Sequence, residues 1–242
     1  MKKTLILVLI TFIFINITNA QSWDNKKIKG NGNITTEIRI TGNYKGIKCA
    51  GSMDFILVSG EEGEITLEGD SNILEYVITE IKNNNLIVKL KKNININYKS
   101  STIKITIPFE KIDTVSLAGS GDLVTENTIK TNTLNVSLAG SGDIKVDVQA
   151  NHVTGAIAGS GDLTLRGKTN KLEAKVAGSG DFHGFNLESN HTEVAVAGSG
   201  DAQVVSYITL KAQVAGSGDV VYKGTPSNKN AKVAGSGSIN KL

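Results

Sequence analysis

The chain has 242 residues, with 26 glycines, 39% hydrophobic and 20% charged residues, a balance that predicts a folded rather than a disordered protein. Its formal charge is +3, and +1 once residues 1–20 are left out, so the surplus of Lys and Arg needed for non-specific nucleic-acid binding is missing. We therefore expect no nucleic-acid partner. The single cysteine, Cys49, excludes an intramolecular disulfide and argues against a cysteine-based zinc cluster.

Residues 1–20 have the pattern of a secretory signal peptide. Lys2 and Lys3 precede a nearly continuous apolar run over residues 4–17, and small residues stand at Thr18 and Ala20. An uncleaved membrane anchor is the alternative, although polar residues interrupt the run. We expect cleavage after Ala20 and an exported chain with no stable membrane span. Its location would be the periplasm, the outer-membrane surface or the extracellular space, where Cys49 would be a buried small hydrophobe.

The segment 21–115 predicts an irregular β part. Apolar and polar residues alternate over 34–40, 64–67, 86–90 and 102–107, which indicates strands with one buried face. Glycine- and asparagine-rich turns separate them. Residues 71–81 fit either a short helix or another strand. Pro108 marks the passage into a regular second part, 116–242, with no clear linker between the two.

The second part repeats the string Ala-Gly-Ser-Gly-Asp at spacings of 18 to 21 residues. A degenerate relative of the motif occupies residues 50–54, and the seventh copy ends in Ser238 rather than Asp. The copies begin at Ala118, Ala139, Ala158, Ala177, Ala197, Ala215 and Ala234.

Apolar residues alternate with polar ones on both sides of each glycine turn, as in Leu134, Val136 and Leu138 before one copy and Ile144 and Val146 after it. Period two around a turn predicts strand, turn, strand. One unit of about 19 residues cannot bury its apolar face alone, whereas stacked units can. The sequence predicts an all-β fold, a right-handed parallel β-helix or β-solenoid with coils of about 19 residues; an antiparallel meander is the alternative.

The repeated turn is interpreted as structural, because a stacked corner needs backbone that passes close to its neighbours, and Ser and Asp can accept hydrogen bonds there. Calcium is a weaker interpretation, since one Asp per coil is a poor match to calcium-binding repeats. The structural turn residues are Gly119, Ser120, Gly121, Gly140, Gly142, Gly159, Gly161, Gly178, Gly180, Gly198, Gly200, Gly216, Gly218, Gly235 and Gly237. The calcium candidates are Asp122, Asp143, Asp162, Asp181, Asp201 and Asp219.

No pattern of catalytic residues emerges. Gly-Ser-Gly lacks the first glycine of a nucleophile elbow and the third glycine of a dinucleotide fingerprint. His152, His183 and His191 are scattered, and the pairs Glu61 with Glu62 and Glu68 with Asp70 are more typical of turns in a charged loop than of glycosidase carboxylates. We expect no enzyme activity and no cofactor.

The repeated turns resemble the autotransporter-adhesin head GIN domain family, formerly a domain of unknown function. The resemblance also covers Gly30-Asn31-Gly32, residues 51–54, residues 68–72 and residues 83–86, and spans about residues 40–240. It implies a β-helical fold in exported proteins of Bacteroidetes-type bacteria, a role in cell adhesion and no recognised catalytic residues.

The leading hypothesis is an exported, non-enzymatic cell-surface module that binds a glycan or protein ligand on a long flat face. A carbohydrate-active β-helix enzyme is an alternative, although aromatic residues make up only 5% of the chain. A structural module that assembles end to end is the other, and would make the protein a homo-oligomer.

Overall fold

The computed structural model describes residues 26–97 and 102–242, so the predicted signal peptide lies outside the described residues. Nearly all regular structure is β, and the helix α1 (Ser71–Leu74) is a single turn. The strands of the first part are β1 (Lys26–Lys29), β2 (Ile34–Ile40), β3 (Gly46–Gly51), β4 (Asp54–Ser59), β5 (Glu64–Asp70), β6 (Val77–Lys82), β7 (Asn85–Leu90), β8 (Ile94–Asn97) and β9 (Lys104–Phe109). Those of the second part are β10 (Thr114–Gly119), β11 (Leu123–Thr125), β12 (Ile129–Gly140), β13 (Ile144–Gly159), β14 (Leu163–Gly178), β15 (Phe182–Gly198), β16 (Ala202–Val205), β17 (Thr209–Gly216), β18 (Val220–Lys223), β19 (Asn228–Gly235) and β20 (Ile239–Lys241).

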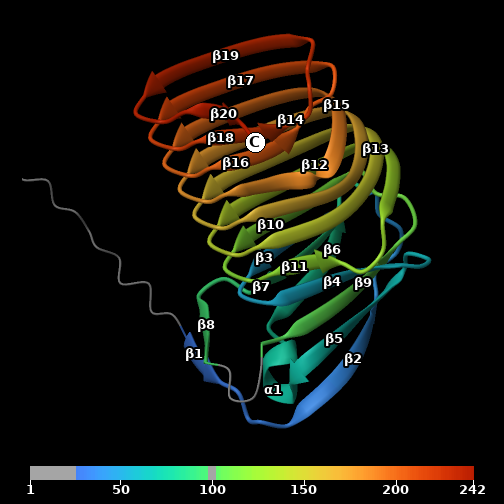
Figure 1. Cartoon of the computed structure of the whole chain (residues 1–242). Helices are drawn as coiled ribbons and strands as arrows, with labels where there is room; N and C mark the ends of the chain where they lie inside the picture. Colours follow the sequence, from blue (N-terminus) through green and yellow to red (C-terminus); the bar gives the residue numbers. More distant parts are fainter. Residues whose placement is uncertain (1–25, 98–101) are drawn as a thin grey trace, which may run out of the picture.

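The repeated motifs stack directly on one another in a β-solenoid (Figure 1). Each motif alanine pairs with the next in parallel register, from Ala118 with Ala139 to Ala215 with Ala234. The degenerate copy forms the preceding rung, because Ala50 pairs with Ala118 and Gly51 with Gly119. Parallel pairing between consecutive coils confirms the predicted solenoid, and the meander is wrong.

The long strands β13, β14 and β15 differ from the two short strands expected in each unit. Each runs from one Gly-Ser-Gly corner to the next and curves around the coil (Figure 1). The register is kept through the middle of these strands, and β14 and β15 shift register once, between Thr164 and Arg166. In this middle part, Asn151 donates its side-chain amide to Asn132 at 2.7 Å, and Asn190 donates to Asn170 at 3.1 Å. These bonds between rungs help the parallel ladder continue around a second corner.

Antiparallel strands close the N-terminal end of the solenoid. β6 pairs antiparallel with β7, β5 pairs antiparallel with β9, and β2 pairs antiparallel with β5. The predicted strand 34–40 coincides with β2, and the other three predicted strands overlap β5, β7 and β9. Residues 71–81 contain both structures that were considered, the turn α1 and the strand β6.

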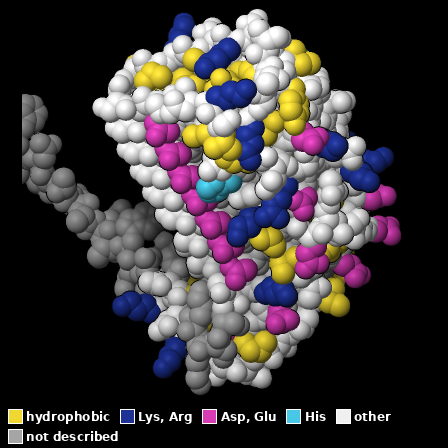
Figure 2. Space-filling model, viewed as in Figure 1, with side chains coloured by type: hydrophobic (Ala, Val, Ile, Leu, Met, Phe, Trp, Pro, Cys, Tyr) yellow, Lys and Arg dark blue, Asp and Glu magenta, His cyan; other side chains and the backbone are white. Residues whose placement is uncertain are grey.

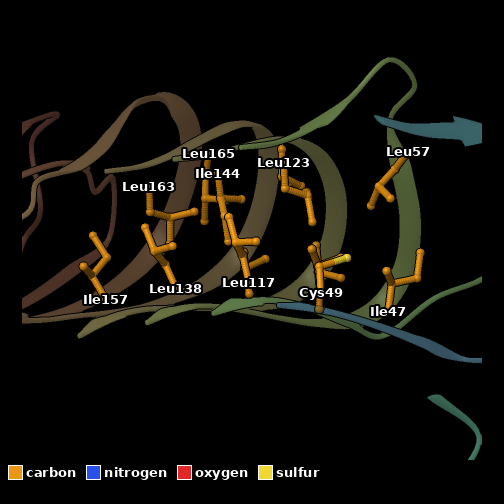
Figure 3. Packing of buried hydrophobic residues seen from close by; sticks show 14 of the residues in the cluster. Ile47, Cys49, Leu57, Leu117, Leu123, Leu138, Ile144, Ile157, Leu163 and Leu165 are labelled. Carbon is orange, nitrogen blue, oxygen red and sulfur yellow. The ribbon is translucent and has the colours of Figure 1, made fainter. Parts of the chain in front are cut away.

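Aliphatic side chains fill the interior between the two sides of the coil (Figure 3). Leu138, Val176 and Val214 have exposed fractions of 2–3%, as the predicted inward columns require. Cys49 lies in the same core and is confirmed as a small hydrophobe; its burial raises the pKa of the thiol well above the ordinary value. The packed interior leaves the outer faces, corners and ends for binding.

Candidate functional site

The predicted turn glycines form one corner that repeats in every rung. A Cβ added at Gly161 would lie 1.9 Å from the carbonyl oxygen of Gly142, one rung below. At Gly159 it would lie 2.2 Å from the carbonyl oxygen of Gly140, and φ there is +135°. In the degenerate copy, Met53 replaces the second glycine and its side chain is buried. The rung beneath this copy is formed by β7 and β9, which do not carry the glycine motif. Glycine is therefore required where one corner lies directly on another.

The predicted aspartates form a continuous column along this corner, visible as a row of acidic side chains in Figure 2. Each carboxylate accepts a hydrogen bond from the backbone N–H of the next motif, as Asp143 N–H donates to Asp122 Oδ1 at 3.1 Å and Asp201 N–H donates to Asp181 Oδ1 at 2.7 Å. Ser238, in the last motif, donates both its N–H and its hydroxyl to Asp219. The carboxylates thus bond the rungs to one another, whereas the sequence pattern indicated bonds within each turn.

One position on the column gathers three groups that could hold a metal ion. Asp162, Asp181 and His183 each offer one ligand atom within 4.8 Å of the others, and His183 Nε2 lies 3.7 Å from Asp162 Oδ2. The repeat pattern does not connect His183 with the aspartates, because His183 stands outside the five-residue motif. The available signal was its position two residues after Asp181, which places both side chains on the outer face of the same strand edge.

We expect Asp181→Ala to destabilise the protein by about 0.5–1.5 kcal/mol, because the backbone N–H of Asp201 loses its acceptor. Asp181→Asn keeps an acceptor and removes one charge from the column, so it should be as stable as the wild type or slightly more stable. Urea unfolding of both variants, with and without calcium, measures the difference. Equal losses in the two variants would show that the bond between rungs needs the carboxylate charge, and a calcium-dependent gain confined to the wild type would show that this charge binds a cation.

The second corner carries a shallow polar groove with a cavity volume of about 520 Å³. Its amide ladder comes from Asn151, Asn170 and Asn190, and Lys130 and Lys168 lie beside it. Lys168 Nζ lies 3.2 Å from the exposed Glu188 carboxylate. The full lining is Lys130, Thr131, Gln149, Ala150, Asn151, Lys168, Thr169, Asn170 and Asn190. The groove offers amide and ammonium donors in successive rungs, a chemistry suited to hydroxyl and carboxylate groups.

The acidic residues considered for glycosidase chemistry have structural partners. Glu62 Oε1 accepts the backbone N–H of Glu110 at 2.9 Å, and Asp70 Oδ1 accepts the N–H of Gly32 at 2.6 Å. Glu61 and Glu62 line a groove of about 610 Å³ near Ile40. In this arrangement Glu62 and Asp70 anchor neighbouring backbone segments.

The remaining two histidines lie apart from the aspartate column. His152 Nε2 lies 3.4 Å from Glu173 Oε1, and a hydrogen bond from Lys171 to the same carboxylate lowers the pKa of Glu173. His191 Nδ1 lies 2.8 Å from the hydroxyl of Thr209 in the next rung. Both histidines therefore belong to contacts between or along strands.

The sequence matches the model of the family described as "Putative auto-transporter adhesin, head GIN domain" over residues 43–226. The chain belongs to this family. The family match covers β3 to β18, and β2 and the last rung lie outside it. A comparison with curated proteins gives no match.

Solved structures of similar proteins have the same fold as this chain. A "putative adhesin" from Bacteroides fragilis is 25% identical, with a TM-score of 0.82 over 89% of this chain and 100% of that one. A "putative lipid binding protein" from Parabacteroides distasonis is 26% identical, with a TM-score of 0.75 over 90% and 100% of the two chains. A "putative adhesin" from the same species, 22% identical with a TM-score of 0.72 over 90% and 100%, supports the fold. Within the described residues, no helix has the length and apolar character needed to cross a membrane.

Proposed function

We propose that this protein is an exported, non-enzymatic adhesion module that binds a hydroxyl- and carboxylate-bearing glycan at the polar corner groove. An adhesion-like role is supported by the description of its family and by the similar solved structure of a "putative adhesin" from Bacteroides fragilis. The observation that supports this binding site most strongly is the row of stacked asparagine amides at the second corner, with exposed lysines beside it.

The groove repeats its donors along the stack. Neighbouring strands lie about 4.8 Å apart, so Asn151 and Asn170 present their side chains at a regular interval. An extended polysaccharide also presents its polar groups at every sugar unit. Because the groove is shallow and exposed, each contact contributes little, and binding depends on several rungs engaging one chain together.

Lysine substitutions test this site. Replacing Lys130 and Lys168 together with alanine should weaken binding to an acidic polysaccharide by about tenfold or more, since two charge-assisted contacts are lost. The measurement is a glycan array with purified protein, with and without calcium, followed by titration of the glycans that bind.

The matched control replaces two exposed lysines outside the groove, Lys145 and Lys175, and removes the same charge. The control should bind like the wild type. The proposed site is wrong if both double variants lose affinity equally, and the glycan proposal is wrong if the wild type binds no polysaccharide on the array.

A further inference from the structure

We infer that Tyr207 forms an aromatic subsite beside the polar corner groove and stacks on a neutral pyranose unit of the bound glycan. The inference rests on the proposed function, because it assigns a further contact to the same ligand. Among the aromatic side chains of the described residues, Tyr207 is the only one that is exposed rather than buried or half-buried, with an exposed fraction of 47%. Tyrosine is enriched at binding surfaces because it combines an apolar ring with a polar tip.

Tyr207 lies at the second corner, one rung beyond the amide ladder. The backbone N–H of Ile208 donates to the carbonyl oxygen of Asn190 at 2.8 Å. Thr209 pairs with His191 in parallel register. The residue before it, Ile208, therefore follows Asn190 in the ladder and is 43% exposed. Neighbouring strands are about 4.8 Å apart, so a sugar chain that follows the ladder meets an apolar surface within one rung of its last amide.

The next rung supports the Tyr207 ring. Gly224 lies beside the ring, and a Cβ added there would be 3.4 Å from Tyr207 Cδ1. The φ of Gly224 is +100°, a conformation that glycine adopts without strain. The missing side chain leaves room for one edge of the ring, while nearly half of the tyrosine stays open to solvent. A ring that is held in place before binding loses little freedom when a ligand covers it.

A second polar groove adjoins the first one at this corner. Its cavity volume is about 340 Å³, and His191 and Thr209 are among the residues that line it. His191 directly follows Asn190, which lines the first groove, and its Nδ1 lies 2.8 Å from the Thr209 hydroxyl. Tyr207 stands two residues before Thr209. The exposed ring is therefore flanked by polar groups of both grooves.

This combination of groups suits a pyranose ring. One face of such a ring presents C–H groups that pack on an aromatic surface, whereas the hydroxyls at its edge need hydrogen-bond partners. Tyr207 offers the aromatic surface, and Asn190 and Thr209 offer an amide and a hydroxyl beside it. An aliphatic corner alone would provide no such selection for a ring.

The spacing between Lys168 and the aromatic ring indicates two kinds of sugar unit. Thr169, which follows Lys168, pairs with Ser189. Ser189 in turn accepts the backbone N–H of Tyr207 at 3.0 Å, so the lysine and the ring lie two rungs apart, about 10 Å along the stack. Lys168 binds a carboxylate-bearing unit, whereas the negative face of the ring favours a neutral one. The ligand is thereby narrowed to an acidic glycan that also contains neutral pyranose units.

Single hydrophobic side chains are also common on protein surfaces, and on that account Tyr207 only covers the corner. Three variants separate the two accounts. Tyr207→Ala removes the ring, and Tyr207→Phe keeps the ring without its hydroxyl. Ile208→Ala is the matched control, because it removes an exposed apolar side chain from the neighbouring position and leaves the ring in place. Circular dichroism should show an unchanged fold for all three variants, since both side chains are exposed.

The first measurement is a titration of the polysaccharides that bind on the glycan array. Tyr207→Ala should lower their affinity by about fivefold or more, the effect of one aromatic contact, whereas Tyr207→Phe and Ile208→Ala should stay within about twofold of the wild type. Unchanged affinity of Tyr207→Ala would overturn the inference. So would equal losses in Tyr207→Ala and Ile208→Ala, since the corner would then need only apolar surface.

The second measurement uses neutral methyl pyranosides, which carry no acidic group. At high millimolar concentrations of these sugars the NMR ring signals of Tyr207 should shift, and those of the buried Tyr44 should not. Tyr207 signals that stay unchanged with every pyranoside would overturn the inference. A wild type that shows these shifts but binds no polysaccharide would contradict the proposed glycan and still support the Tyr207 subsite, so the two failures are distinguishable.

Discussion

Replacing Gly159 with alanine should destabilise the protein by about 2–5 kcal/mol, enough to unfold much of a protein of ordinary stability. A side chain there adopts a left-handed backbone at φ +135°, which costs about 1–2 kcal/mol. Its Cβ would also lie 2.2 Å from the carbonyl oxygen of Gly140. This oxygen belongs to the backbone of the rung below and accepts the N–H groups of Ser160 and Gly161, so it cannot move away without breaking the corner.

Gly63→Ala is the matched control. Gly63 has a similar φ of +129°, but a Cβ there would meet nothing within 4 Å. Gly63→Ala should therefore lower the free energy of unfolding only by the backbone strain, about 1–2 kcal/mol. Urea unfolding followed by circular dichroism measures both variants. Equal losses would mean that the corner glycines are required for their backbone conformation alone and that the rungs are not in close contact there.

Phe182→Ala should cost about 3–5 kcal/mol, because the ring is fully buried and its loss leaves a cavity in the core. The ring occupies space that two glycines leave free. A Cβ at Gly155 would lie 2.7 Å from Phe182 Cε2, and one at Gly184 would lie 2.6 Å from Cε1. The large side chain and the small residues therefore fill one region of the core together.

A double-mutant cycle tests this complementarity. Gly155→Ala should destabilise the wild type, since the added methyl group collides with the ring. In a Phe182→Leu background it should be neutral or stabilising, because the collision is relieved and alanine restricts the unfolded chain more than glycine does. Additive free energies of unfolding in the four proteins would show that Gly155 and Phe182 do not share this space.

The period of the repeats predicted much of the solenoid. Leu138, Val176 and Val214 lie inside because each stands two residues before a corner glycine, and a two-residue period assigns one face of each strand to the core. The antiparallel closure by β2, β5 and β6 was not predictable in the same way. Alternation identifies a strand, but the direction in which the chain returns beside its neighbour is decided by contacts between segments distant in the sequence.

The candidate groove was missed although its signal was present. Asn132, Asn151, Asn170 and Asn190 recur at intervals of 19, 19 and 20 residues, the same period as the glycine motif. A single repeated residue in polar surroundings is less conspicuous than a five-residue string. The role of the aspartates could not be predicted for a different reason. Each carboxylate accepts an N–H group from the next coil. Whether the two groups meet depends on the register between coils, which the sequence does not specify for a side chain in a turn.

Spin-label distances between corner serines test most directly that equivalent motifs occupy successive rungs. The side chains of Ser120, Ser199, Ser217 and Ser236 are exposed, so labelled cysteines can replace them while Cys49 stays buried. Pairing a label at position 120 with labels at 199, 217 and 236 spans four, five and six rungs, and each added rung should lengthen the distance by about 4.8 Å. Distances that do not increase in equal steps with rung number would contradict the solenoid and the binding surfaces derived from it.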